Sequence, residues 1–260
     1  MLIKKIVSGI LAFLLLILFN LSVEKSCYSI VIIFIVTMII LKNSYDLYFH
    51  KKLCVANCFF NQNSSVYTIT TGKTFSLIVS FIVSIVLSMT LMLSIASYTD
   101  NFVHQMGILF IDIFILIILY TIFIKNKIIK NDINHIFITN FTAFVNAILL
   151  SIIFMFGSLN EKSPSYIDND LKITIQNASV KTVTQCESFE NLLLISNGID
   201  GMKKWLLLNY QLNFASQNYL LIFLVLIGNF TMAFAYGRYI LAITNLHNNP
   251  HLKKENGKEE

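Results

Sequence analysis

Six long stretches with few or no charged residues constrain this chain more than any other feature of its sequence. Asp112 is the one charged residue within these stretches, which are residues 6–23, 26–41, 74–99, 102–124, 133–160 and 205–237. A helix needs about 20 predominantly apolar residues to cross the ~30 Å hydrocarbon core of a bilayer. The pattern therefore predicts an all-α integral membrane protein built as a six-transmembrane-helix bundle.

The overall composition agrees with this fold class. Of 260 residues, 56% are hydrophobic and only 13% are charged, and the mean hydropathy is +0.70. Soluble domains carry about 25% charged residues. The composition excludes a soluble cytosolic enzyme, a disordered chain and a small secreted domain held together by disulfides.

The last apolar stretch is too long for a single crossing. It follows Lys203 and Lys204 and begins with Trp205, and basic and aromatic side chains of this kind favour the headgroup level. We therefore expect an interfacial amphipathic helix at about 202–214 before the sixth span. The first region, 1–157, is expected to hold five spans, at about 6–23, 27–45, 74–98, 103–124 and 135–157, with a cytoplasmic loop at 46–73. An extracytoplasmic segment follows at 158–216. The sixth span is expected within 217–245, and a cytoplasmic tail at 246–260.

The distribution of lysine and arginine predicts the orientation. With the N-terminus inside, cytoplasmic segments hold 13 of the 19 basic residues, as the positive-inside rule requires. The opposite orientation would export Lys125, Lys127 and Lys130. An abundance of Ile, Asn and Lys, typical of AT-rich genomes, favours a bacterium. We expect a multi-pass protein of the plasma (bacterial inner) membrane with both termini in the cytoplasm.

The segment 158–216 is the one sizeable piece expected outside the membrane. Leu171, Ile173 and Ile175 alternate with polar residues, and so do Val183 and its neighbours, which predicts a short β-hairpin. A short helix is expected to begin at 188–190, and Asn197-Gly198 is typical of a turn. These features predict a small α+β insertion. Fewer than 60 residues make a marginal core, so we expect the segment to pack on the membrane face or on a partner, or to be an ordinary ordered loop.

Serines recur every fourth residue in the third span, at Ser76, Ser80, Ser84 and Ser88. This spacing places them along one helix face. Small residues on such a face allow close helix approach in lipid, and their hydroxyls can bond across the contact. We therefore interpret them as a helix-packing face, with a polar pore lining as the alternative.

Asp112 is the only carboxylate inside a predicted span. A charge at the bilayer centre costs about 2.5–3.5 kcal/mol on insertion scales, so its side chain should face the bundle interior or water. Counting about 1.5 Å per residue from the outer helix ends places Asp112, Asn146 and Asn229 at roughly similar depths. His104 lies on the same helix face as Asp112. We expect an intramembrane polar layer, which marks either a transport path or a helix-locking hydrogen bond.

The remaining polar candidates are anchors and thiols. Arg238, near the inner end of the sixth span, is expected to reach the headgroups as an interfacial anchor, as are Lys203, Lys204 and Trp205. Cys27 and Cys186 are both expected outside, where a disulfide between them is one alternative and two free thiols the other. Cys54, Cys58 and His50 make an incomplete zinc ligand set, so we expect no metal and no cofactor.

Nothing in this pattern forms a catalytic constellation. We therefore expect a non-enzymatic subunit or accessory (scaffold) component of a larger membrane complex of the cell envelope. A channel or transporter subunit that uses Asp112, Asn146 and Asn229 is the alternative, and an integral-membrane lipid-modifying enzyme ranks third. Expected partners are the lipid bilayer and other proteins or further copies of the chain, contacted through the transmembrane helices and the 158–216 segment, and no nucleic acid.

Overall fold

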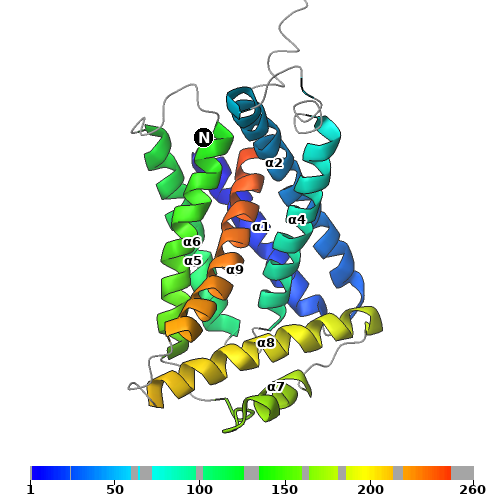
Figure 1. Ribbon diagram of the computed structural model, residues 1–260, viewed down its shortest axis with the longest axis vertical. Coiled ribbons are helices and arrows are strands. Elements are labelled where there is room, and N and C mark those ends of the chain that lie inside the picture. Colours follow the sequence, from blue (N-terminus) through cyan, green and yellow to red (C-terminus); the bar gives the residue numbers. More distant parts are fainter. Residues whose placement is uncertain are drawn as a thin grey trace, which may run out of the picture.

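A computed structural model describes residues 2–23, 25–59, 64, 72–97, 102–125, 135–159, 164–180, 186–212 and 219–246. In this part of the chain all regular secondary structure is helical (Figure 1). The helices are α1 (Leu2–Val23), α2 (Tyr28–Phe59), α4 (Lys73–Ala96), α5 (Phe102–Lys125), α6 (His135–Leu159), α7 (Leu171–Val180), α8 (Glu187–Leu212) and α9 (Tyr219–Leu246).

The prediction of six apolar helices of membrane-spanning length is confirmed. Segments long and apolar enough to cross a bilayer lie in α1, α2, α4, α5, α6 and α9: Ile3–Val23, Tyr28–Asp46, Lys73–Ala96, Phe102–Lys125, Phe137–Gly157 and Val225–Thr244. Helix α2 continues past its apolar part to Phe59, so the expected loop at 46–73 begins as helix. These six helices identify a multi-pass membrane protein.

Helix α9 is the central helix of the bundle. It packs most extensively against α6 and also contacts α1, α2, α4 and α5, and Figure 1 shows it in the middle of the group. Its apolar segment is the most buried of the six and the least hydrophobic. A helix enclosed by protein needs no lipid-facing apolar stripe. For that reason α9 can carry asparagine, tyrosine and arginine inside the membrane.

Helices α7 and α8 form a platform at one end of the bundle, which we call the α7–α8 platform (residues 171–180 and 187–212). Figure 1 shows α8 lying across the ends of the spanning helices, with α7 on its far side. The expected short helix at 188–190 and the expected interfacial helix at 202–214 correspond to the two halves of α8, although 213–218 lie outside the described residues. Helix α8 thus crosses the ends of the spanning helices, the arrangement expected of an interfacial helix.

The predicted β-hairpin is wrong, because α7 is a helix. Leu171 and Ile175 fit a period of two and equally a helical period, so their spacing alone is ambiguous. The buried side chains of α7 are Thr174 and Ala178, which share that helical face, while Ile173 is 42% exposed. Val183 lies outside the described residues. The insertion is therefore all-helical in its described part.

A helix-start signal explains this correction. The backbone N–H of Lys172 donates to Asp170 Oδ1 at 2.7 Å, which is the hydrogen bond of an N-cap aspartate. A cap satisfies one of the amide groups that have no partner within the first turn of a helix. Asp170 was therefore the residue from which the helix could have been predicted.

The predicted turn at Asn197-Gly198 is also wrong, because α8 continues through it. Gly198 and Gly201 face α7 instead. A Cβ atom built on Gly201 would lie 2.6 Å from Ala178 Cβ, and one built on Gly198 would lie 3.2 Å from Ser179 Oγ. The two glycines lower the helix propensity of α8 by about 1 kcal/mol each, but they allow α7 to approach closely.

We predict that Gly201→Ala lowers the free energy of unfolding by about 1–3 kcal/mol, because the new methyl group has no room between α7 and α8. Trp205 is the only tryptophan in the chain, and its indole N–H donates to the Asp168 carbonyl beside α7. Thermal unfolding of the detergent-solubilised protein, followed by Trp205 fluorescence, measures the change. Gly107→Ala is the control, since a Cβ there meets nothing within 4 Å. Equal unfolding temperatures for both variants would contradict the close α7–α8 contact.

Candidate functional site

Asp112 and Asn146 form a direct hydrogen bond inside the bundle. Asn146 Nδ2 donates to Asp112 Oδ2 at 2.8 Å, which joins α5 to α6. Asp112 is only 3% exposed and Asn146 is fully buried. Beside them, the Tyr236 hydroxyl of α9 donates to the Leu109 carbonyl of α5 at 2.6 Å. These bonds link α5, α6 and α9 within the membrane-spanning region.

The other two members of the expected polar layer lie elsewhere. His104 is exposed at the start of α5. Asn229 comes seven residues before Tyr236 on α9, which corresponds to about 10 Å along a helix. Because the Tyr236 hydroxyl bonds to α5 one turn from Asp112, Asn229 lies nearer the platform end. Counting residues from the helix ends does not give this difference in depth. Helix α9 begins at Tyr219, before its apolar segment starts at Val225.

Two tyrosines of α9, expected at the interface beside Arg238, instead make buried contacts between helices. Tyr236 is described above, and the Tyr239 hydroxyl donates to the Ala12 carbonyl of α1 at 3.1 Å. Both side chains are fully buried. A buried tyrosine generally finds a hydrogen-bond partner for its hydroxyl. Tyrosines inside a predicted span were therefore the available signal for contacts between helices.

A small polar cavity lies between the α7–α8 platform and the ends of the spanning helices. Its volume is about 50 Å³, enough for a few water molecules. We call it the α8 cavity, and its lining residues are Ser94, Ser97, Gln105, Phe154, Asp200, Lys203, Lys204, Leu207, Val225, Asn229 and Met232. Neither Asp112 nor Asn146 contributes to this lining.

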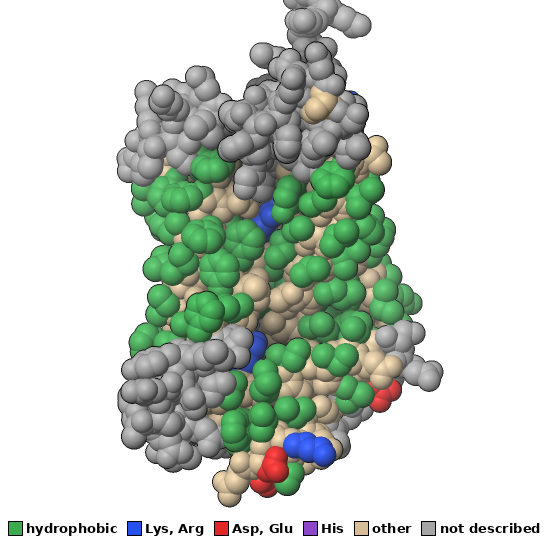
Figure 2. Space-filling model, viewed as in Figure 1, with side chains coloured by type: hydrophobic (Ala, Val, Ile, Leu, Met, Phe, Trp, Pro, Cys, Tyr) green, Lys and Arg blue, Asp and Glu red, His purple; other side chains and the backbone are tan. Residues whose placement is uncertain are grey.

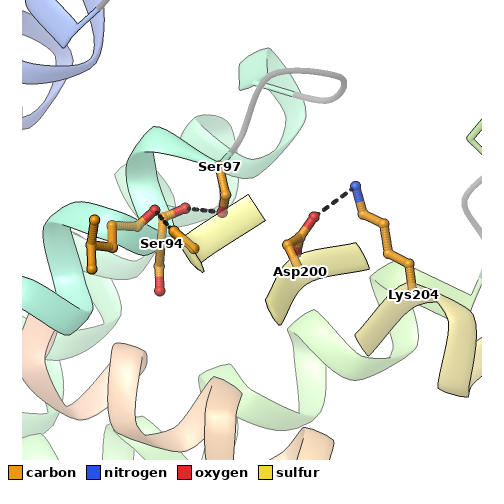
Figure 3. Close-up of polar contacts among 6 residues, drawn as sticks. Ser94, Ser97, Asp200 and Lys204 are labelled. Carbon is orange, nitrogen blue, oxygen red and sulfur yellow. Dashed lines mark hydrogen bonds and ion pairs between the residues drawn. The ribbon is translucent and has the colours of Figure 1, made fainter. Parts of the chain in front are cut away.

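Part of the polar lining is paired within the protein. Lys204 Nζ lies 3.1 Å from Asp200 Oδ2, one turn away on α8, and Figure 3 shows the two side chains extending toward each other. At the end of α4, the Ser97 hydroxyl donates to the Ser94 carbonyl at 2.8 Å. These contacts leave Lys203, Gln105, Asn229 and the Ser94 hydroxyl as the other hydrogen-bonding side chains of the lining.

The two neighbouring lysines have different environments. Burial lowers the pKa of Lys203, and the carboxylate of Asp200 offsets this only in part. For Lys204 burial also lowers the pKa, but Asp200 and Tyr166 outweigh it, so the net pKa is raised. The interactions with Asp200 and Tyr166 hold Lys204 within the platform. Lys203 instead extends toward Gly228 of α9.

The expected anchors at 203–205 make contacts within the protein. A Cβ built on Gly228 of α9 would lie 2.9 Å from Lys203 Cε. Lys204 also lies over the Tyr166 ring at 5.8 Å. The Trp205 indole N–H donates to the Asp168 carbonyl at 3.0 Å. These contacts attach α8 to α9 and to the segment that precedes α7.

The expectation that Arg238 reaches the headgroups is wrong. Arg238 is 3% exposed, and its Nη2 donates to the Ser44 hydroxyl of α2 at 3.1 Å. The guanidinium also lies 5.8 Å from the Phe234 ring centre. The physical reason is the position of α9. Near its C-terminal end α9 packs against other helices, so Arg238 is enclosed by protein there.

The four serines of α4 lie on a buried face. Ser76, Ser80, Ser84 and Ser88 are all 0% exposed. The Ser80 and Ser84 hydroxyls each donate to the carbonyl four residues earlier, at 2.6 Å. The Ser88 and Thr37 hydroxyls are 2.7 Å apart and connect α4 to α2, the helix against which α4 packs most extensively. This is the geometry of a helix contact rather than a pore lining.

Cys27 and Cys186 are joined by a disulfide, with their Cα atoms 5.2 Å apart. It connects the turn between α1 and α2 to the start of α8. Beside it, the Phe19 and Phe189 rings make an edge-to-face contact at 6.2 Å. Farther along α8, the Ser196 hydroxyl donates to the Leu93 carbonyl of α4 at 3.0 Å. The platform is thus attached covalently and through side-chain contacts.

No group of three or more His, Cys, Asp or Glu side chains suited to a metal ion occurs among the described residues. The side chains of His50, Cys54 and Cys58 lie outside the described part of the chain, so the incomplete zinc set stays a sequence observation. Comparison with protein-family models, with curated proteins and with solved structures finds no match to this chain. Its function is therefore argued from its own geometry.

We predict that the wild-type protein migrates faster on a non-reducing gel than after reduction, because the disulfide closes a loop of 159 residues. Cys186→Ser should migrate like the reduced protein under both conditions. Loss of the cross-link should also destabilise the fold by about 2–5 kcal/mol. Cys54→Ser is the control and should keep the shift. A shift that persists in Cys186→Ser would refute the Cys27–Cys186 pairing.

Proposed function

We propose that this protein is a non-enzymatic scaffold or accessory subunit of a larger membrane complex. The enclosure of Asp112 supports this proposal most directly. A carboxylate on a transport path must be reached by water or substrate, whereas Asp112 is 3% exposed and bonded to Asn146. On this proposal the Asp112–Asn146 hydrogen bond stabilises the contact between α5 and α6, as interhelical hydrogen bonds do in membrane bundles.

We further propose that the α7–α8 platform faces outward and that both termini lie in the cytoplasm, with the bacterial inner membrane as the location. In this orientation 13 of the 19 lysine and arginine residues fall in segments expected in the cytoplasm, which is the positive-inside pattern. The Cys27–Cys186 disulfide lies on the platform side, and disulfides persist in oxidising compartments. Two independent arguments thus support one orientation.

The platform is the proposed contact surface for another protein. Ile173 of α7 and Ile195 and Ile199 of α8 are exposed, and exposed apolar side chains can mark a contact site for another protein. The disulfide and the close α7–α8 packing hold this surface in one arrangement. A preorganised surface loses less entropy when it binds a partner.

A channel or transporter subunit is the second candidate, supported by the α8 cavity and its Asn229 side chain. Transport along this route would require the cavity to extend from Asn229 to Asp112. The scaffold proposal and the transport proposal therefore differ in whether water reaches Asp112.

Thiol labelling in intact cells tests this difference. In a background with Cys54→Ser and Cys58→Ser, Asp112→Cys should resist a membrane-impermeant maleimide, because its site is closed. Asn229→Cys, in the wall of the α8 cavity, is the matched control and should react. Labelling of both positions at similar rates would favour a transport path and contradict the scaffold proposal.

Purification from native membranes in mild detergent tests the partner surface. We expect the wild-type chain to co-purify with another protein in fixed stoichiometry, and Ile195→Asn combined with Ile199→Asn to reduce this by about tenfold or more, as for loss of a central apolar contact. Glu190→Gln, an exposed change on the same helix, should have no effect. Recovery of the wild-type chain as a lone monomer would count against a complex subunit.

A further inference from the structure

The α8 cavity is a polar site at a level where most neighbouring side chains are apolar. Figure 2 shows a face covered mainly by hydrophobic side chains and interrupted by a hollow, with a basic side chain at its edge. Helix α8 crosses the ends of the spanning helices here (Figure 1), which is the headgroup level if these helices span the bilayer. A polar cavity at this depth can receive a polar group that enters from the membrane.

Lys203 supplies a positive charge to this cavity. Its Nζ would lie 3.3 Å from a Cβ built on Gly228, so the absence of a side chain at Gly228 makes room for the ammonium. The nearby carboxylate of Asp200 forms its ion pair with Lys204. Asp200 attracts both lysines, and the three charged side chains together leave one positive charge.

Gln105 supplies a hydrogen-bond acceptor to the same cavity. Its Oε1 atom is buried and has no hydrogen-bond partner among the described residues, although buried polar atoms are normally satisfied. A ligand that satisfies the cavity must therefore carry a negative charge for Lys203 and an N–H or O–H donor for Gln105. A phosphate ester with an ammonium or hydroxyl substituent has both groups.

The surroundings favour a ligand with an apolar part. Phe223 and Ile227 of α9 are exposed, and on the same helix Val225 and Asn229 line the cavity. A phospholipid could place its acyl chains along the exposed side chains while its headgroup enters the cavity.

We propose that the α8 cavity binds the phosphate headgroup of a membrane phospholipid, with the Lys203 ammonium opposite the phosphate and Gln105 Oε1 accepting from the headgroup substituent. Phosphatidylethanolamine and phosphatidylglycerol fit this chemistry. Phosphatidylcholine does not, because its quaternary ammonium has no N–H. The inference stands independently of the proposed scaffold function.

Native mass spectrometry of the whole chain in detergent, with one lipid added at a time, tests the site. We expect phosphatidylethanolamine and phosphatidylglycerol to bind about tenfold more tightly than phosphatidylcholine. Lys203→Gln should weaken binding of the first two lipids by about tenfold or more, since it removes a charge-assisted hydrogen bond. Lys172→Gln removes the same charge from an exposed position on α7 and should change nothing.

A second variant keeps the test decisive if Lys203→Gln does not fold, as judged by Trp205 fluorescence. Gln105→Leu should bring the three lipids to similar affinity. Equal binding of the three lipids by the wild type, or unchanged binding after Lys203→Gln, would overturn the proposal. Inorganic phosphate at millimolar concentration should not displace the lipid. If it does, the ligand is a free phosphate and the lipid assignment is wrong.

Discussion

Enclosure of α9 by the other helices is the constraint on which the rest of this structure depends. In a bilayer, a polar side chain that faces lipid has no partner, so it must find one inside the protein. Five neighbouring spans surround α9, and its polar side chains bond to them: Tyr236 to α5, Tyr239 to α1 and Arg238 to α2. The same enclosure places the Asp112–Asn146 bond of α5 and α6 in a closed interior.

The α7–α8 platform depends on this bundle for its position. The start of α8 is joined to the α1–α2 turn by the disulfide, and the second half of α8 contacts α9 through Lys203 at Gly228. Polar side chains of α4, α5, α8 and α9 line the α8 cavity, where α8 meets these helices. We propose this cavity as the phosphate-headgroup site and the exposed isoleucines of the platform as the partner surface.

The six spans could be predicted from the sequence, whereas the 171–175 segment and Gly198 could not be predicted from local patterns alone. The apolar stretches predicted the six spans, because length and absence of charge are properties of each segment alone. Leu171 and Ile175 satisfy both a strand and a helix period, so their spacing predicts a strand where the structure has a helix capped by Asp170. Gly198 is typical of a turn by sequence, but in the structure its missing side chain allows the close approach of α7.

The sequence by itself determined that the chain is a six-span helical membrane protein. It singled out Asp112 and the serine face as needing partners, and it left open whether Cys27 and Cys186 are bonded. Only the tertiary structure decided which partners they have. Asp112 meets Asn146 but not Asn229, and Arg238 meets Ser44 rather than the headgroups. The physical reason is that burial in a bundle depends on the rotation and relative height of each helix, which are set by packing between helices and not by the pattern within one.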